Sequence, residues 1–118
     1  MKHETLLGYW RKAVHKLKGD NCVSCGAPYA KCHHVIYVRR RLLAYDERNG
    51  LPLCDECHRK AHAIPGWERQ FLSDEDLRYL DARATVNLKD YFVAEGLTPE
   101  EWRSRMSERL RAIIKGER

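Results

Sequence analysis

The chain has 118 residues, of which 43% are hydrophobic and 33% are charged, and its formal net charge is +5. We expect a single domain over 1–118 with a modest hydrophobic core. A bound structural metal adds much stability to a domain of this size. The composition excludes a disordered chain. No apolar run approaches the roughly 18 residues of a membrane span, and the first residues are not an apolar signal segment, so we expect a cytoplasmic protein without membrane contact.

Residues 1–19 are predicted to form an N-terminal helix. Thr5 is the expected cap, and Lys18 followed by Gly19 is the expected end. Apolar side chains recur at helical spacing and predict a face that packs on the core, namely Leu6, Leu7, Trp10, Ala13, Val14 and Leu17. The opposite face is basic and suited to contact phosphates.

The middle of the chain, residues 20–63, is predicted to alternate loops with two short strands and one helix. The expected order is a loop over 19–31, a strand over 33–38, a turn at Asn49-Gly50, a strand over 51–53 and a helix over 55–63. Pro52 lacks a backbone N–H, which predicts an edge strand.

Residues 64–118 are predicted to be a helical extension. Ser73 caps a helical region that ends at Gly96, as one helix or two. Thr98, Pro99 and Glu101 predict the start of a final helix. Its apolar side, which includes Trp102, packs either on the core or on a second subunit. The expected fold is α+β, with two or three helices after the central region.

Four of the five cysteines form two Cys-x-x-Cys pairs, 22/25 and 54/57. Each pair fits a tight turn that directs two thiolates to one point, and two such turns provide the tetrahedral set that structural zinc prefers. We therefore predict a structural Zn²⁺ held by Cys22, Cys25, Cys54 and Cys57. Cys32 is left over, and a free buried cysteine is favoured over a substitute ligand.

Four histidines have the spacing of a catalytic metal site. His58 and His62 are four residues apart and share one face of a helix. His33 and His34 are adjacent on a strand and point in different directions. One of them can ligate an ion while its neighbour activates water, and these are two requirements of phosphodiester hydrolysis.

Several stretches keep a fixed order, spacing and residue type over about residues 20–63: Cys22-x-x-Cys25, His33-His34-Val35-Ile36, Asn49-Gly50-Leu51-Pro52-Leu53-Cys54-x-x-Cys57-His58 and His62. Together they resemble the HNH endonuclease family, in its four-cysteine zinc-binding subset. The resemblance implies a small ββα-metal core, a β-hairpin followed by a helix around one catalytic ion. It also implies that His34 is the general base, that Asn49 orients the base or its loop, and that the ion is held by His33, His58 and His62.

The resemblance implies a metal-dependent DNA endonuclease of low sequence specificity from a phage or mobile element, working in the host cytoplasm. Mg²⁺ or Mn²⁺ is the expected catalytic ion, and a three-histidine site also suits Ni²⁺ or Zn²⁺. The zinc-binding subset includes junction-resolving and packaging-associated nucleases, so a phage packaging or recombination partner is a further expectation. A homodimer would cut both strands of DNA, and a monomer would nick.

Basic side chains near the site are predicted to contact DNA phosphates: Arg39, Arg40, Arg41 and Lys60. The alternative for the three arginines is a solvated basic loop.

Other zinc proteins fit less well. A nucleobase deaminase needs His-x-Glu and a proline directly before its Cys-x-x-Cys, and this chain has neither. A zinc finger with two cysteines and two histidines needs a histidine pair about twelve residues after a cysteine pair, and neither cysteine pair here is followed by one at that distance. A non-catalytic, zinc-stabilised DNA-binding accessory module remains the alternative, and an RNA substrate stays open.

Overall fold

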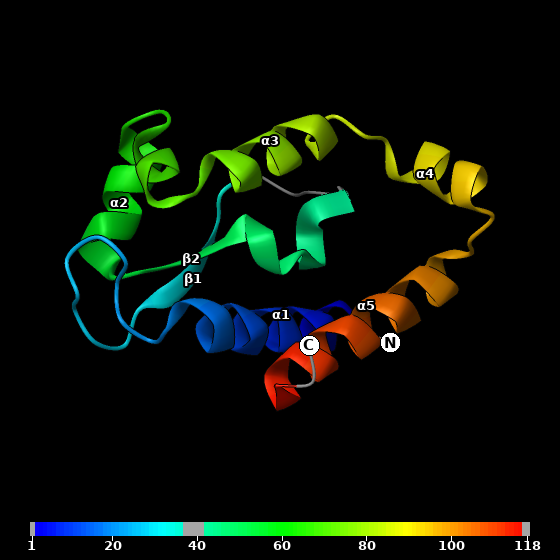
Figure 1. The fold of residues 1–118 in the computed structure, drawn as a ribbon, viewed down its shortest axis with the longest axis horizontal. Coiled ribbons are helices and arrows are strands. Elements are labelled where there is room, and N and C mark those ends of the chain that lie inside the picture. The colour runs from blue at the N-terminus through cyan, green and yellow to red at the C-terminus, as the bar shows by residue number, and fades with distance from the viewer. Residues whose placement is uncertain (1, 37–41, 117–118) are drawn as a thin grey trace.

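A computed structural model describes residues 2–36 and 42–116. Within them the α-helices and strands are α1 (His3–Lys18), β1 (Lys31–His34), β2 (Gly50–Leu53), α2 (Asp55–Ala63), α3 (Asp74–Arg83), α4 (Leu88–Glu95) and α5 (Pro99–Lys115) (Figure 1). The described residues also form three 3-10 helices: η1 (Leu42–Tyr45), η2 (Glu47–Asn49) and η3 (Trp67–Phe71). The fold is α+β, as predicted, with a ββα unit between α1 and three further helices.

The two strands form an antiparallel sheet that pairs Lys31 with Leu53 and His34 with Gly50. The predicted first strand, 33–38, was wrong at both ends, because β1 begins at Lys31 and stops at His34. Residues 37–38 of that prediction lie outside the described residues. Its partner β2 begins at Gly50, opposite His34, and beyond that pair the Val35 amide donates to the Asn49 carbonyl oxygen at 3.2 Å. The backbone bends at Val35 and Ile36 instead.

Gly50 does not belong to the predicted tight turn, because its backbone is extended (φ −134°) and it is the first residue of β2. A Cβ atom here would lie 2.5 Å from Cγ2 of Val14 and 2.9 Å from Cζ2 of Trp10. The glycine is therefore required by the close packing of β2 on α1. Pro52 does lie on an edge strand, as predicted, since both strands of a two-stranded sheet are edges.

Helix α1 begins two residues before the predicted cap, because Lys2 and not Thr5 is its N-cap residue, and no side chain caps it. It ends at Lys18, as predicted. Leu6, Trp10, Ala13 and Val14 are its buried residues. Leu17, which we placed on the same face, is 45% exposed.

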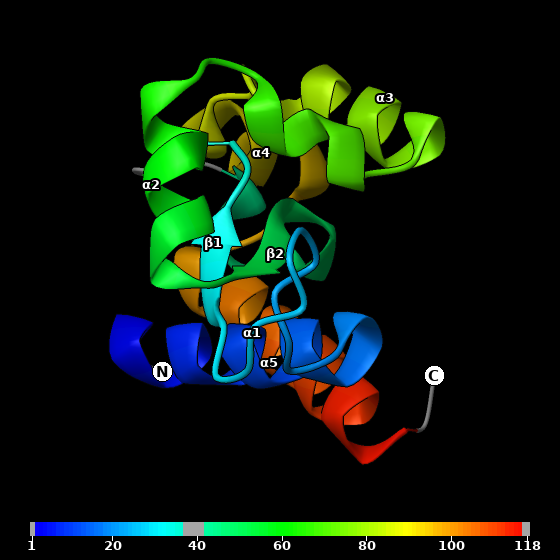
Figure 2. The ribbon, with the colours of Figure 1, turned by 90° about the vertical axis from the view of Figure 1, so that its left-hand side faces the viewer.

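Helix α1 packs against the sheet on one side and against α5 on another (Figures 1 and 2). The predicted start of α5 is confirmed, with a capping box between Thr98 and Glu101. Trp102 and Leu110 join the α1 side chains in one buried cluster, so α5 packs on the core. An ion pair between Arg109 and Glu47 also ties α5 to η2.

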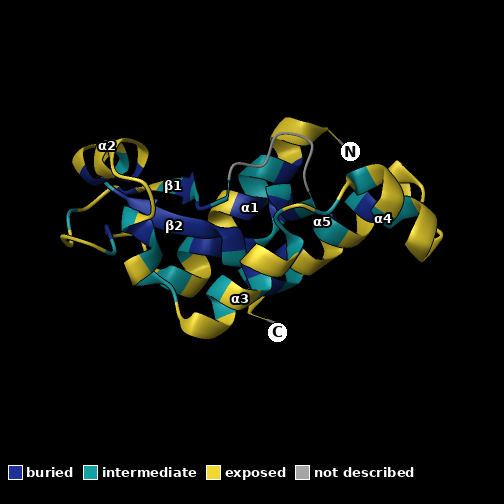
Figure 3. Ribbon diagram, turned by 90° about the horizontal axis from the view of Figure 1, so that it is seen from above, coloured by how far each residue is buried: buried dark blue, intermediate teal, exposed yellow. Residues whose placement is uncertain are grey.

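The region after Ser73 forms two helices and not one. The Ser73 hydroxyl accepts from the Asp76 amide and caps α3, and the Asn87 side chain caps α4. A second buried cluster lies under the sheet and includes Leu80 of α3 and Leu53 of β2. Strand β2 is buried along its whole length (Figure 3). In the part of the chain that the structure describes, no helix has both the length and the apolar character to cross a membrane.

Candidate functional site

The four paired cysteines converge on one point. The Sγ atoms of Cys22, Cys25, Cys54 and Cys57 all lie within 4.8 Å of one another, and those of Cys25 and Cys54 are 3.6 Å apart. Thiolates bound tetrahedrally at about 2.3 Å from zinc stand about 3.8 Å apart. The cluster therefore fits the predicted structural zinc, and a shell of four thiolates leaves no position open for water.

Local backbone geometry directs these thiols. The Gly26 amide donates to the Cys22 carbonyl at 2.9 Å in a turn where Gly26 has φ +78°. Cys54 is the N-cap residue of α2, and its Sγ accepts from the Cys57 amide. Burial raises the pKa of the Cys57 thiol to about 12, so the protein alone leaves this thiol protonated at neutral pH. A bound cation is what would hold it as a thiolate.

His33, His58 and His62 form a second cluster. Their ligand nitrogens lie within 4.8 Å of one another, and the two Nε2 atoms of His58 and His62 are 3.0 Å apart. The rings of His58 and His62 lie edge-on to that of His33, with centroids at 5.0 and 5.3 Å. His33 is buried and His62 is exposed, so the cluster opens to solvent on the side of α2.

The histidine cluster suits a divalent ion. Burial and the neighbouring His58 and His62 lower the pKa of His33 to about 4, and burial also lowers the pKa of His58. These two rings are therefore neutral at pH 7, the form that binds metal. Three protein ligands leave positions for water or substrate, unlike the closed cysteine site.

His34 points to the other face of the sheet, toward α1. Its ring stacks on that of Trp10, with a centroid distance of 3.8 Å and an interplanar angle of 3°. Its Nε2 lies 3.0 Å from the Ala44 carbonyl oxygen. Since a carbonyl can only accept, Nε2 must carry the hydrogen, and the lone pair of the neutral ring is on Nδ1. Burial lowers the pKa of His34, and the charge of Arg11 lowers it further.

Asn49 is completely buried, and its side chain is bonded to backbone. It accepts from the Ile36 amide at 2.7 Å and donates to the carbonyls of Ile36 and Leu43 at 3.1 and 3.3 Å. The bend after β1 is thereby tied to η1. Both the oxygen and the nitrogen of the Asn49 amide are thus engaged with backbone groups. Its orienting role in the reaction stays a prediction.

The predicted DNA contacts are only partly described. Arg39, Arg40 and Arg41 lie outside the described residues, and Lys60 is exposed on α2. Cys32 is half-buried and free, its thiol facing the Arg11 carbonyl oxygen at 3.6 Å, and it belongs to neither cluster.

Two residues at the site were not predicted. Trp10 was assigned only to core packing, yet its ring covers His34. Glu68, in η3, is 8% exposed, and its Oε1 lies 3.9 Å from Nε2 of His33. No motif marks Glu68, because nothing in the sequence places a 3-10 helix over the histidine cluster.

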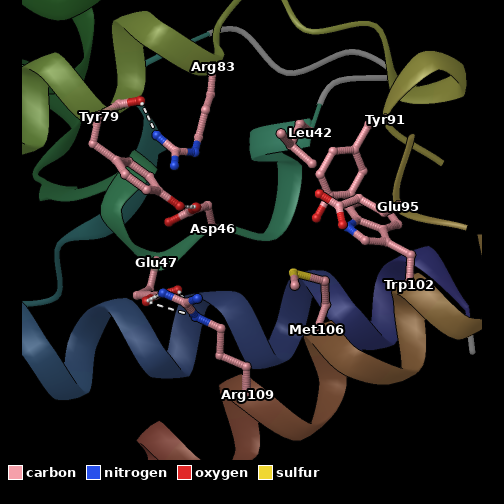
Figure 4. Close-up of a pocket in the computed structure, with 10 residues that line it drawn as sticks. All are labelled: Leu42, Asp46, Glu47, Tyr79, Arg83, Tyr91, Glu95, Trp102, Met106 and Arg109. Carbon is pink, nitrogen blue, oxygen red and sulfur yellow. Dashed lines mark hydrogen bonds and ion pairs between the residues drawn. The ribbon is translucent and has the colours of Figure 1, made fainter. Parts of the chain in front are cut away.

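A cavity of about 290 Å³ lies between η1, η2 and the three C-terminal helices (Figure 4). Neither metal cluster lines it. Several of its polar groups are paired with one another, Arg109 with Glu47 and Tyr79 with Asp46. The cavity is therefore separate from the histidine site.

Comparison with known protein families points to the region that holds both clusters. Residues 22–63 match the model of a family described as HNH endonuclease. The match includes both clusters and covers less than half of the chain. No curated protein and no solved structure matches. An HNH segment indicates nuclease activity in general and a nucleic-acid substrate.

Proposed function

We propose that this chain is a metal-dependent DNA endonuclease that hydrolyses phosphodiester bonds at a single divalent ion, with His34 as the general base. The observation that carries the proposal is the contrast between two adjacent histidines. His33 joins two further imidazoles in a cluster open to solvent. His34 stands apart, with Nε2 bonded to a carbonyl and Nδ1 without a hydrogen bond to any described residue. Binding alone requires neither arrangement.

His34 has the features of a base that works near neutral pH. Its lowered pKa keeps the ring neutral, and its hydrogen bond to Ala44 leaves the Nδ1 lone pair to take a proton from water. The water oxygen then bonds to phosphorus, and the bond from phosphorus to the 3′ oxygen breaks. Stacking on Trp10 holds the ring in one plane throughout.

His33, His58 and His62 would hold the catalytic ion. When bound, a divalent ion stabilises the negative charge that develops on the phosphate and on the leaving oxygen. Mg²⁺ or Mn²⁺ remains the proposed ion, with Ni²⁺ or Zn²⁺ also suited to an all-imidazole set.

Basic side chains would hold the DNA backbone, with low sequence specificity. Arg11 acts electrostatically on His34, so a phosphate that reaches the base is also within the influence of this guanidinium. Lys60 is exposed on the helix that carries His58 and His62. The Arg39–Arg41 run and the phage or mobile-element origin stay predictions from the sequence.

The test is conversion of supercoiled plasmid by the zinc-loaded chain, with Mg²⁺, Mn²⁺, Ni²⁺ or EDTA. His34→Ala is compared with His15→Ala, which removes a histidine of α1 outside both clusters. We expect wild type and His15→Ala to nick or linearise DNA only with metal. We expect His34→Ala to lose at least about 100-fold in rate, the scale of general-base catalysis, while keeping its zinc.

Equal cutting by His34→Ala and wild type would remove His34 as the base. If no protein cuts plasmid or branched DNA, but all retard DNA equally in a gel, the chain is a binding module and the proposal is wrong.

A further inference from the structure

Glu68 is a buried carboxylate placed against the proposed ion site by an element outside the HNH segment. It lies in η3, beyond the matched residues 22–63. The helix α2 ends at Ala63, and the chain turns at Gly66, which has a left-handed backbone, before η3 begins. This turn brings η3 back along α2, and Glu68 is its buried residue.

Glu68 and His33 face each other in a buried contact. Glu68 is 8% exposed and His33 7% exposed, and Oε1 of the one lies 3.9 Å from Nε2 of the other. Among the described residues, Oε2 of Glu68 and Nε2 of His33 are buried and make no hydrogen bond. Burying a carboxylate without a partner is costly, so a carboxylate kept at this place points to a specific partner.

We propose that Glu68 is a positioning residue that orients His33 toward the catalytic ion by accepting the hydrogen on Nε2. The inference rests on the proposed divalent-ion site and extends it by one residue. A carboxylate can only accept, so an Nε2 that hydrogen-bonds to it must carry the hydrogen. The lone pair of the neutral His33 ring then lies on Nδ1, where it can bind the ion.

The contact needs only a small adjustment. The distance from Nε2 to Oε1 exceeds an ordinary N–H···O hydrogen bond by about 1 Å. Carboxylates that bond the far nitrogen of a metal-binding histidine fix its tautomer and orientation, and their loss typically weakens metal affinity about 10- to 100-fold. No carboxylate oxygen of Glu68 belongs to the group of ligand atoms that all lie within 4.8 Å of one another, which favours a role through His33 over direct ligation.

The first test measures binding of a second zinc ion by calorimetry, on protein that already holds one zinc at its cysteines. We expect wild type to bind it and Glu68→Gln to bind it at least about 10-fold more weakly. Glu68→Asp keeps the charge and is expected to bind more tightly than Glu68→Gln. Glu75→Gln removes an exposed carboxylate of α3 and is expected to match wild type. Zinc content and thermal midpoint confirm that each variant is folded.

The second test reads the tautomer of His33 in wild-type protein with two zinc ions bound. Long-range proton–nitrogen spectra of nitrogen-15-labelled histidine show which ring nitrogen carries the hydrogen, and His33→Ala identifies the signal. We expect hydrogen on Nε2 and zinc on Nδ1. Because this test uses no Glu68 variant, it decides the inference even if Glu68→Gln fails to fold.

Three results would overturn the inference. Hydrogen on Nδ1 of zinc-bound His33 would exclude a bond to Glu68 through Nε2. Equal second-zinc affinity in wild type and Glu68→Gln would show that the carboxylate charge does not orient His33 for the ion, and would leave the proposed ion site intact. A wild-type protein that binds no second ion, neither zinc nor an ion that supports cleavage, would overturn both the inference and the ion site.

Discussion

At the level of single residues, His33 and His34 are neighbours in the chain but lie in different environments. His33 and His34 alternate across β1, so one faces α2 and the other faces α1. A strand thus places two imidazoles in two environments without any loop between them. The support comes from groups that do no chemistry themselves, the Ala44 carbonyl and the Trp10 ring.

Asn49 supports the end of this strand, and we expect Asn49→Ala to be strongly destabilising. The substitution leaves the Ile36 amide and two carbonyls without their bonds to this side chain, at about 1–3 kcal/mol for each buried group. We expect the free energy of unfolding in urea to fall by about 3 kcal/mol or more. Asn87→Ala, at an exposed helix cap, is the control and should cost about 1 kcal/mol. Equal losses in the two variants would contradict this account of Asn49.

At the level of elements, the contact between β2 and α1 fixes the position of His34, the proposed base. Val14 and Trp10 of α1 pack directly over Gly50, and the same Trp10 ring covers His34. Helix α1 lies outside the HNH segment, yet it supplies one wall of the site. The proposed role of His34 as the base therefore makes the position of α1 part of the proposed site.

Gly50→Ala is expected to push α1 away from the sheet. The new methyl group would lie 2.5 Å from Val14 Cγ2, and overpacking of this kind costs about 1–3 kcal/mol. We also expect lower cleavage and a changed tryptophan fluorescence, because Trp10 must move. Gly8→Ala is the matched control, since its methyl group meets nothing within 4 Å and should stabilise α1 by about 1 kcal/mol. The packing argument fails if both variants change stability in the same direction.

The sequence predicted the elements whose ends are set by residues close to them in the chain. Helix α2 has the predicted bounds, and α5 begins at the predicted cap, because capping residues act within one turn. The extent of β1 was wrong, since it depends on where the partner strand begins. Glu68 and the stacking of Trp10 were missed for the same reason, because both depend on contacts between elements distant in the chain.

At the level of the whole molecule, the cysteine site and the buried cluster between α1 and α5 stabilise different parts. The cysteine site ties the loop of Cys22 and Cys25 to the start of α2. Cys22 and Cys57 also belong to the buried cluster under the sheet. The cluster between α1 and α5 is separate from it and contains no zinc ligand. Loss of zinc therefore acts first on the ββα unit.

We expect removal of zinc to unfold the ββα unit and to abolish binding of the catalytic ion. Structural zinc contributes about 10–16 kcal/mol in small zinc domains, as much as the whole stability of an ordinary domain. His58 directly follows Cys57, so the two metal sites share the first turn of α2. The measurement is thermal unfolding, followed by circular dichroism, before and after treatment with a strong chelator.

Cys25→Ser and Cys32→Ser separate the two kinds of cysteine in this experiment. Cys25 belongs to the zinc cluster and Cys32 does not, so only Cys25→Ser should lose the metal and behave like the chelated protein. Cys32→Ser should keep one zinc per chain and its unfolding midpoint within a few degrees of wild type. If chelated wild type keeps its cooperative transition, the α1–α5 cluster and the sheet are sufficient for the fold, and zinc only orders the Cys22–Cys25 loop. In that case second-ion binding would survive chelation, because His33 and α2 would stay in place.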